Sequence, residues 1–369
     1  MSPATSSKDA PGHGREQLFL GEQWWASRWS WLKGRGYTLR PRYHPNWKPS
    51  WKVGKVDARK YEDGQLPNFN SNIMDATARD GTFVTLKRID LTRHPQEVEI
   101  SVMLSSPELA KDPRNHSVRI TEVLEDVPDA SDTAILVMPL LSKIDAPFVE
   151  TIGEFVAFYT QILEGLQFIH ERHIAHCDFY GTNVMMDSGP LYPVPFHPRK
   201  VTRRRDWKGK VRPYTRTERP VKYYIIDYGL SHRFKPDEPA PLIVPIIPGD
   251  KSVPEHQGMK EFEASDPFAT DIYTAGNLVN EWFVKRAAGF DFMRPLISDM
   301  TQDDPAKRPK IDEVVRRFSE LRASLDTKQL RSRVRDKWTI YPSFAGLRFW
   351  MRKMNFTLSG TPPIPDPRT

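Results

Sequence analysis

The sequence predicts an α+β protein in which a smaller β-rich part precedes a larger, mostly helical part. Three stretches of the chain support this order. IMDATARDGTFVTLKRID contains two runs able to form strands around the turn signal Asp80-Gly81, which predicts a β-hairpin. QEVEISVMLSS then has helical spacing, and TAILVMPLL is a short apolar run typical of a buried strand. From Thr151, large apolar residues recur every three or four positions and predict a long amphipathic helix.

The second half of the chain also favours helices. YYIID predicts one more short strand, whereas DPFATDIYTAGNLVNEWF and IDEVVRRFSELRASL have the apolar spacing of helices. No internal repeat is visible, so a repeat architecture is not expected.

The N-terminal residues form two further segments. Residues 1–17 are rich in Ser, Pro and Gly, which predicts a disordered tail. Residues 18–59 are an extension rich in tryptophan. Trp25 and Trp29 lie four positions apart and, with Leu32, predict one face of a short helix that packs on the main body. A partner-binding surface is the alternative interpretation.

The composition indicates a folded intracellular protein. The apolar runs are too short to span a bilayer, and MSPATSSKDAPGHGREQ lacks the apolar core of a secretory signal, so we expect no transmembrane segment. The single cysteine, Cys177, excludes an internal disulfide, which suits a reducing compartment. We therefore expect the cytoplasm, the nucleus or both.

One segment carries the formal net charge of +7. Residues 197–222 hold eleven Lys or Arg against two acidic residues, a net +9, which leaves the rest of the chain at −2. They belong to an insertion, residues 188–222, without apolar periodicity, which predicts a functional or disordered loop. Its charges favour solvated disorder, a nuclear-import receptor or an acidic partner. No stacking array or recognition-helix pattern accompanies them, so we predict no specific nucleic-acid binding.

Eight polar residues follow one another at particular points along the predicted strands, helices and loops. Lys87 ends the strand VTLK, and Glu99 opens EISVML on the next predicted helix. Asp178 precedes Asn183 by five positions, and Asp227 opens Asp-Tyr-Gly after YYII. Three more follow in order: Glu255 in VPEHQ, Asp271 in DIYTAG and Arg308 in DDPAKRP. This order resembles that of the protein kinase family, whose members carry VAIK, a helix glutamate, HRDxxxxN, DFG and APE motifs. The whole chain is also similar to a group of kinase-like proteins common in fungi.

The resemblance implies a two-lobed protein-kinase-like fold. Residues 60–141 would be the β-rich lobe and the hinge, residues 142–325 the helical lobe, and residues 326–369 a basic aromatic tail. The implied activity is the ATP- and Mg²⁺-dependent transfer of a phosphoryl group to Ser or Thr of a protein substrate. Such a transfer depends mainly on positioning and on neutralising charge, which explains why cations, carboxylates and an aimed hydroxyl are needed.

The resemblance also assigns a role to each polar residue of the centre. Lys87 would contact the nucleotide phosphates and would be oriented by Glu99. Asp178 would accept a hydrogen bond from the substrate hydroxyl and take its proton, and Asn183 and Asp227 would ligate Mg²⁺, which prefers oxygen donors.

Apolar and supporting residues are assigned in the same way. Ile73 would cover the adenine, Met138 would face it, and Leu140 and Leu141 would lie in the strand that joins the lobes. Glu255 and Arg308 would form a buried pair, and Asp271 would brace the backbone around His176. These last three roles are structural.

Three departures from the kinase pattern favour a second interpretation. The expected glycine-rich loop falls on QLPNFNSN, where Leu66, Asn68 and Ser71 occupy the glycine positions. Tyr180 stands where relatives have a lysine that neutralises the transferring phosphate, and Cys177 replaces the arginine of HRD. The alternative is therefore a pseudokinase that serves as a scaffold or switch. A kinase for a small molecule is the third hypothesis.

Two other local patterns leave alternatives open. His170, His173, His176 and Cys177 are candidate zinc ligands, although a spacing of three suits one ion poorly unless the segment is helical. The tail segment FAGLRFWMRKMNF mixes aromatic and basic residues, so it either packs back on the protein or rests on an anionic membrane surface.

Overall fold

The computed structural model describes residues 15–53, 57–66, 70–237, 241–244, 250–337 and 344–368. Its chain divides into two compact units. The first unit comprises Met1–Thr92, Ile120–Leu140 and Pro193–Arg212, and the second comprises Arg93–Arg119, Leu141–Tyr192 and Pro213–Thr369. Most of the predicted disordered tail, and Asn68 of the expected loop, lie outside the described residues.

The two units differ from the predicted boundaries in two places. Residues 93–119, expected with the β-rich part, belong to the second unit. Residues 193–212, expected as an insertion of the helical part, belong to the first. The order of the sequence does not show to which unit these two segments belong, because each unit is built from three separate stretches of the chain.

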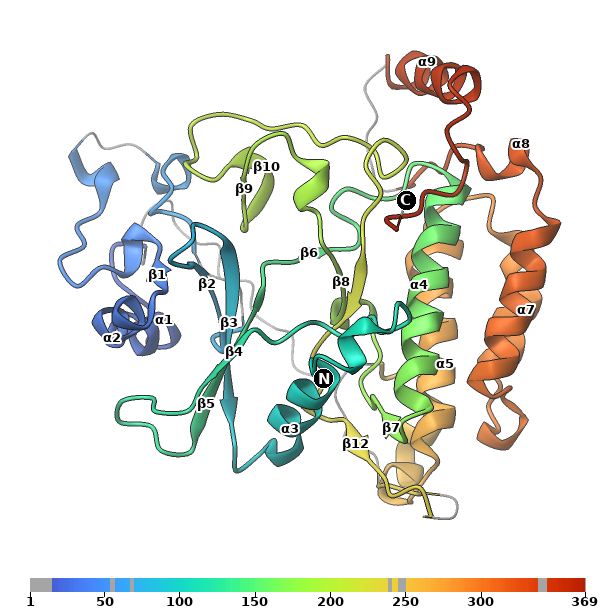
Figure 1. The fold of residues 1–369 in the computed structure, drawn as a ribbon, viewed down its shortest axis with the longest axis horizontal. Coiled ribbons are helices and arrows are strands. Elements are labelled where there is room, and N and C mark those ends of the chain that lie inside the picture. The colour runs from blue at the N-terminus through green and yellow to red at the C-terminus, as the bar shows by residue number, and fades with distance from the viewer. Residues whose placement is uncertain are drawn as a thin grey trace. The chain divides into compact units, whose positions relative to one another are not determined.

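The first unit contains a five-stranded antiparallel sheet in the order β1-β2-β3-β5-β4. Its strands are β1 Thr38–Leu39, β2 Ile73–Thr77, β3 Phe83–Asp90, β4 Glu122–Leu124 and β5 Thr133–Pro139 (Figure 1). β2 and β3 are the predicted hairpin, and β5 is the predicted buried strand. Burial alternates along β2 and β3, as expected for a sheet with two different faces.

The tryptophan-rich extension supplies the core on one face of this sheet. Trp25 and Leu32 are fully buried there together with strand residues such as Met74, Leu86 and Val137. The indole Nε1 of Trp25 donates a hydrogen bond to the carbonyl of Ser71 at 2.9 Å. The packing interpretation is therefore confirmed for Trp25 and for Leu32, because the apolar area of both side chains is removed from water.

The extension forms two short helices rather than the single predicted one. They are α1 Leu20–Ala26 and α2 Trp29–Arg35. Arg28 lies between them, where its guanidinium donates to the carbonyls of Pro128, at 3.1 and 2.7 Å, and of Trp24, at 3.0 Å. Trp29 therefore begins the second helix and does not share one continuous face with Trp25.

The basic insertion is folded, so the prediction of solvated disorder was wrong. β9 Phe196–His197 and β10 Lys200–Arg204 form an antiparallel pair in the first unit. Trp207 is buried against the ring of His197, with ring centroids 4.8 Å apart. The guanidinium of Arg205 pairs with Asp75 on β2 at 2.8 Å. Some of the charges that suggested a solvated loop are thus used inside the unit.

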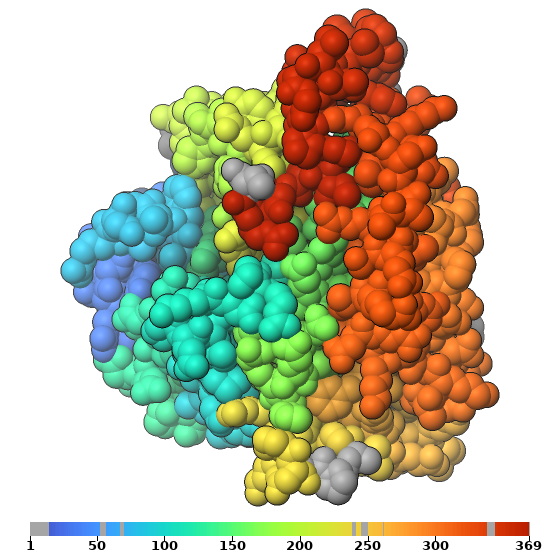
Figure 2. Space-filling view, turned by 45° about the vertical axis from the view of Figure 1, so that its right-hand side comes forward, coloured from blue at the N-terminus to red at the C-terminus, as the bar shows by residue number. Residues whose placement is uncertain are grey.

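The second unit contains most of the helices. They are α3 Pro95–Leu104, α4 Ile152–His170, α5 Pro267–Val279, α6 Arg294–Met300, α7 Ile311–Ser324, α8 Thr327–Leu330 and α9 Ala345–Leu358, and α4, α5 and α7 run side by side (Figures 1 and 2). α4 is the predicted long helix, capped by the Thr151 hydroxyl, which accepts from the amide of Glu154 at 3.1 Å. α5 ends at Val279, and the predicted helix continues as a π-helical turn, Asn280–Val284.

Short strands in the second unit position the loops between them. β6 Ser142–Lys143, β8 Val184–Met186 and β11 Tyr223–Ile225 form one antiparallel sheet in the order β11-β8-β6. β7 Ile174–Ala175 pairs with β12 His232–Arg233. Among the helices that the structure describes, none is both long and apolar enough to cross a membrane.

Candidate functional site

Two strand pairs bring the two predicted catalytic segments together in the second unit. Residues 176–183 join β7 to β8, and residues 226–231 join β11 to β12. Because β7 pairs with β12 and β8 pairs with β11, both ends of the two segments are held side by side. The amide of Ile226 donates to the carbonyl of Asn183 at 2.9 Å and links the segments directly.

Asp271 fixes the backbone at the start of the first segment, as predicted. Its carboxylate is fully buried on α5 and accepts hydrogen bonds from the amides of His176, at 2.7 Å, and Cys177, at 2.9 Å. It also accepts from Nε2 of His170 at 3.0 Å. Cys177 has a φ of 63°, a conformation that costs free energy for a residue with a side chain and needs such support.

The imidazole of His176 connects the two segments. Its Nε2 donates to the carbonyl of Ile226 at 3.0 Å, and its Nδ1 accepts from the amide of Asp178 at 3.3 Å. These two bonds assign the neutral tautomer with the proton on Nε2. His176 and Asp271 are therefore positioning residues for the backbone on either side of Asp178.

Asp178 and Asn183, to which the kinase resemblance assigned separate roles, are in direct contact. The side-chain amide nitrogen of Asn183 donates to the carboxylate Oδ2 of Asp178 at 2.8 Å and to its carbonyl at 2.9 Å. The other carboxylate oxygen, Oδ1, is buried and has no hydrogen-bond partner among the described residues. A buried oxygen without a hydrogen bond costs free energy, which a further donor would recover. Oδ1 is therefore suited to accept a hydrogen bond from a substrate hydroxyl.

Burial raises the pKa of Asp178 above its usual value, and the negative charges of Asp227 and Asp271 act in the same direction. The hydrogen bond from Asn183 opposes the increase without cancelling it. A carboxylate with a raised pKa is a better proton acceptor than an exposed aspartate. This is the electrostatic setting that a general base needs.

The turn that begins with Asp227 is tightly constrained. Asp227 has a φ of 67°, and its Oδ1 accepts a 3.4 Å hydrogen bond from the amide of Gly229. A Cβ on Gly229 would lie 3.0 Å from Oε2 of Glu97 and 3.2 Å from Oδ1 of Asp227. A side chain at this position would therefore require one or both carboxylates to shift by a few tenths of an ångström.

The buried glutamate beside this turn is Glu97, two residues before the predicted Glu99. Glu97 is only 2% exposed, whereas the side chain of Glu99 is 69% exposed and lies 3.7 Å from the guanidinium of Arg233. The sequence contained the necessary signal, because Glu97 falls in register with the buried residues Ile100 and Leu104 at helical spacing. Glu99 lies on the other side of the same helix.

The residues predicted to contact the nucleotide from the β-rich part lie in the sheet of the first unit. Ile73 on β2 and Leu136 on β5 are the strand neighbours of Lys87 on β3. By the two-residue alternation of strands, Ile73, Lys87 and Met138 point from one face, opposite the face that packs on the tryptophan-rich extension. Leu140 follows β5, and its amide donates to the carbonyl of Phe83 at 3.2 Å.

Leu141, the last residue of the predicted hinge, is assigned to the second unit and is half-buried. The unit boundary therefore falls between Leu140 and Leu141, inside the segment predicted to join the two parts.

Glu255 and Arg308 form the predicted buried pair. Two parallel hydrogen bonds of 2.6 and 2.7 Å join the guanidinium to the carboxylate, and the side chains are 0% exposed for Arg308 and 7% for Glu255. The hydroxyl of Thr270 also donates to the carboxylate, at 2.8 Å. Burial alone would raise the pKa of Glu255, but the hydrogen bonds and charge of Arg308 lower it below its usual value.

The surroundings of Tyr180 were not foreseen. Tyr180 is half-buried at the position of the expected lysine, and Gly181 follows it. A Cβ on Gly181 would lie 2.4 Å from the indole of Trp282, which belongs to the π-helical turn after α5. The glycine thus allows this indole to pack directly on the segment, a contact between distant residues that sequence spacing does not indicate.

The four candidate zinc ligands do not converge. His170 bonds to Asp271, Nε2 of His176 donates to the carbonyl of Ile226, and the thiol of Cys177 lies 3.5 Å from the carbonyl of Ala175. Burial, together with the nearby Asp271, raises the pKa of the Cys177 thiol well above its usual value, which disfavours the thiolate that zinc requires. The zinc interpretation is therefore not supported.

The donors of the candidate site fit magnesium better. Within the described ranges, no group of three or more His, Cys, Asp or Glu is arranged to hold a metal ion by itself. Mg²⁺ does not need such a cage, because it usually takes one or two carboxylates and completes its shell with substrate phosphates and water. The amide oxygen of Asn183 and the carboxylate of Asp227 are oxygen donors of the required hard character.

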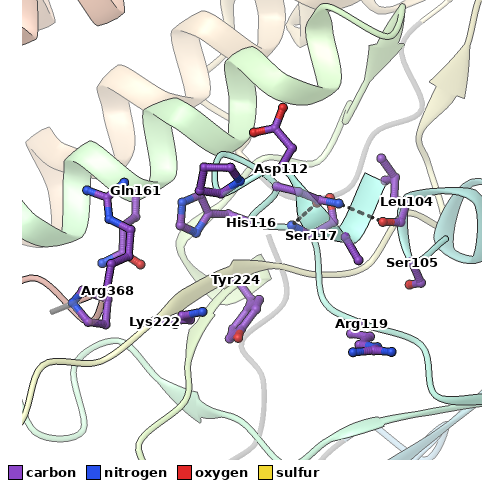
Figure 3. A pocket seen from close by; sticks show the side chains of 14 residues that line it. Leu104, Ser105, Asp112, His116, Ser117, Arg119, Gln161, Lys222, Tyr224 and Arg368 are labelled. Atoms are coloured by element: carbon purple, nitrogen blue, oxygen red, sulfur yellow. Dashed lines mark hydrogen bonds between the residues drawn. The ribbon is translucent and has the colours of Figure 1, made fainter. Parts of the chain in front are cut away.

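A separate cavity in the second unit contains none of the predicted site residues. It encloses about 240 Å³ beside the end of α3, residues 110–119 and α4 (Figure 3). Arg119, Lys222 and Arg368 line it. His116 lies between Gln161 and Ser117 in this view, and its Nδ1 donates to the carbonyl of Tyr223 at 3.1 Å. The cavity does not contribute to the candidate site.

Comparison with known proteins leaves the family assignment open. No protein-family model matches the chain, and no curated protein shows significant similarity to it. The resemblance to protein kinases therefore stays a prediction, based on the motifs and on the geometry described above.

Proposed function

We propose that the protein is an ATP- and Mg²⁺-dependent protein kinase with a two-lobed protein-kinase-like fold. The content of the units supports this proposal, since the first is built on an antiparallel sheet and the second on helices around short strand pairs. The acceptor class, protein Ser or Thr, rests on the motif resemblance alone.

The observation that carries the proposal is the environment of Asp178. Oδ2 of its carboxylate accepts a hydrogen bond from Asn183, whereas Oδ1 is buried without a partner among the described residues. The backbone just before Asp178 is held by its hydrogen bond to Asp271. The raised pKa prepares the free oxygen to accept the proton of a substrate hydroxyl. A purely structural aspartate in this position would have both of its oxygens satisfied.

Asn183 and Asp227 are the proposed magnesium ligands, and Lys87 remains the proposed cation for the nucleotide phosphates. Mg²⁺-bound ATP supplies the transferred phosphoryl group and the positive charge that neutralises it. Asn183 has a second task, because the same side chain holds the carboxylate of Asp178 in place. His176 aligns the segments that carry Asp178 and Asp227.

The substitution at Tyr180 favours a second candidate function. Without the expected lysine, the developing charge on the phosphate loses one preorganised partner, which costs about 3 kcal/mol or roughly a hundredfold in rate. The alternative is therefore a pseudokinase that binds nucleotide but transfers phosphate weakly or not at all. Binding and transfer have to be measured separately to distinguish the two.

Asp227→Asn should abolish the magnesium-dependent part of ATP binding. Wild-type protein is expected to melt at a higher temperature with ATP and Mg²⁺ than with ATP alone, because Asp227 would help to hold the metal that accompanies the nucleotide. The substitution keeps the size of the side chain but removes its charge. Thermal-shift measurements with ATP, with and without Mg²⁺, test this result.

The same protein samples, assayed for transfer of the terminal phosphate of ATP to a protein acceptor, separate the two candidates. Magnesium-dependent binding together with transfer supports the kinase, and binding without transfer supports the pseudokinase. If Asp227→Asn leaves both magnesium dependence and transfer unchanged, Asp227 is not a metal ligand.

Glu97→Gln should reduce kcat/KM by a factor on the order of 10 to 100, whereas Glu99→Gln should change it by no more than about twofold. Glu97 is the buried carboxylate beside the Asp227 turn and takes the role first assigned to Glu99. The two substitutions are chemically identical and lie on the same helix, so each is the control for the other. Equal effects would show that the burial of Glu97 has no functional meaning.

A further inference from the structure

An exposed apolar stripe runs along the C-terminal helix α9. Leu347 is 60% exposed, Trp350 57% and Leu358 82%, and Phe344, Met351 and Met354 are also exposed. These residues recur at steps of three and four, so they lie on one face of the helix. Figure 2 shows α9, in dark red, projecting from the second unit.

The opposite face of α9 holds the helix on the protein. Arg352 bonds to the carboxylate of Glu150, and the guanidinium of Arg333 lies 5.3 Å from the centre of the Phe349 ring. Phe349 and Phe356 line a small pocket that also includes Thr151. Arg352, Phe349 and Phe356 face the rest of the unit, so the apolar stripe on the opposite side of α9 faces solvent.

Basic residues border the stripe. The sequence from residue 337 to 365 contains no Asp or Glu, while it contains Lys337, Arg348, Arg352 and Lys353. At 3.6 residues per turn, Arg348 and Lys353 fall on the two opposite edges of the stripe. Arg348 is exposed. An apolar face with tryptophan between two basic edges is the pattern of a helix that lies in the interface of an anionic membrane.

A second copy of the chain is a poorer occupant of this face. A 14-residue helix is about 21 Å long, and a stripe roughly 10 Å wide gives about 200 Å² per copy. Two such stripes would bury roughly 400 Å², well below the ~1,200 Å² of a stable specific interface. The uncompensated positive charges would also repel each other. Neither objection applies to a surface of anionic lipid headgroups.

We propose that α9 is an in-plane anchor for an anionic lipid bilayer surface. Leu347, Trp350 and Met354 enter the boundary between headgroups and acyl chains, and Arg348 and Lys353 contact the headgroups. The helix does not cross the bilayer, and the attachment is reversible. This inference is independent of the proposed kinase activity, because it uses no residue of the candidate site.

Vesicle co-sedimentation of the full chain tests the apolar contribution. The probes are vesicles of phosphatidylcholine alone and of phosphatidylcholine mixed with phosphatidylserine. The variant Leu347→Glu/Trp350→Glu should bind the mixed vesicles at least tenfold more weakly than wild type, since two interfacial side chains are lost. The control Met259→Glu/Phe262→Glu, at two apolar residues that are 78% and 67% exposed elsewhere in the unit, should bind like wild type.

A second pair of substitutions tests the charge contribution. Arg348→Gln/Lys353→Gln should weaken binding to the mixed vesicles by a factor on the order of 10, because each basic residue near an anionic surface contributes about fivefold. Binding of wild type to the same vesicles should fall as salt is added. Neutral vesicles should bind both proteins equally weakly.

Three results would overturn the proposal. The first is an absence of wild-type binding to the mixed vesicles, and the second is equal binding by the Leu347→Glu/Trp350→Glu variant. The third is a concentration-dependent dimer in analytical ultracentrifugation that this variant abolishes while vesicle binding stays unchanged, which would assign the stripe to self-association. Because Leu347 and Trp350 are exposed, their replacement should leave the melting temperature unchanged, and the glutamine pair provides the test should the glutamate variant not fold.

Discussion

Replacing Asp178 with asparagine should lower the rate of phosphoryl transfer by a factor of about 10² to 10⁴, the usual contribution of a positioned base. The amide has almost the shape of the carboxylate, but it cannot take the proton of the acceptor hydroxyl. The hydrogen bonds that Asn183 donates to Oδ2 and to the backbone carbonyl can largely persist, so the segment should keep its conformation. Nucleotide binding should therefore stay close to that of wild type.

Transfer of labelled phosphate from ATP, measured beside the thermal shift with ATP and Mg²⁺, checks this expectation. Asp303→Asn, the same substitution at an exposed position, is the matched control and should transfer at the wild-type rate. If Asp178→Asn keeps more than about a tenth of the wild-type rate, Asp178 is not the base. If wild type itself shows binding without transfer, the pseudokinase interpretation holds instead.

The pH profile gives an independent test of the same residue. The pKa of Asp178 is raised in the folded protein, so the acid limb of kcat/KM should lie above the range of an exposed aspartate, near pH 4. Activity should fall as the pH decreases through this raised value, since the base becomes protonated.

The free energy of unfolding should decrease as the pH rises through the pKa of Asp178, whereas activity increases. An acid whose folded pKa lies above its unfolded pKa binds more protons in the native state between the two values, so stability decreases as the pH rises through them. Asp178→Asn removes this ionised and partly buried charge. The variant should therefore be at least as stable as wild type at neutral pH, which a merely structural aspartate would not allow.

The segments predicted correctly are those in which local pattern and tertiary burial agree. Burial in the hairpin Ile73–Thr77 and Phe83–Asp90 alternates as far as Lys87, and the predicted long helix forms from Ile152 to His170, where it is buried on most sides. Asp178 and Asn183 were both selected from one short motif, and the structure places their side chains in contact. In each case the information is contained in a short stretch of the chain.

The segments predicted wrongly depend on partners far away in the sequence. The single helix through Trp25 and Trp29 is interrupted because Arg28 bonds to the carbonyl of Pro128, one hundred residues later. The basic insertion is folded because Asp75 and other distant groups receive its charges. The composition shows that Arg205 is charged, but it does not show that Arg205 forms an ion pair with Asp75.

The choice between Glu97 and Glu99 depends on a different kind of information. Both glutamates lie on one helix two residues apart, so their order along the chain does not separate them. The buried register of Ile100 and Leu104 could have decided it, since it includes Glu97 and excludes Glu99. Helical phase is therefore a better guide to such a residue than its distance along the chain.

Arg308→Met should destabilise the protein by about 3 to 5 kcal/mol, the usual cost of breaking a buried ion pair from one side. Methionine fills much of the volume, but it leaves the carboxylate of Glu255 buried without its guanidinium. Chemical denaturation followed by circular dichroism measures the change in the free energy of unfolding. The control is Arg316→Met on α7, which breaks an exposed pair with Glu320 and should cost no more than about 0.5 kcal/mol.

The pH dependence of this loss identifies its cause. In wild type the folded pKa of Glu255 is lowered, so the stability from the pair is complete above the unfolded pKa and is lost as the pH falls through the folded value. In Arg308→Met burial is no longer opposed, and the pKa of Glu255 should rise, so that protonation relieves the buried charge. The deficit should therefore be largest at neutral pH and should shrink as the pH approaches about 4. A deficit that is the same at both pH values would mean that methionine disturbs packing, and that the charge of Glu255 contributes little.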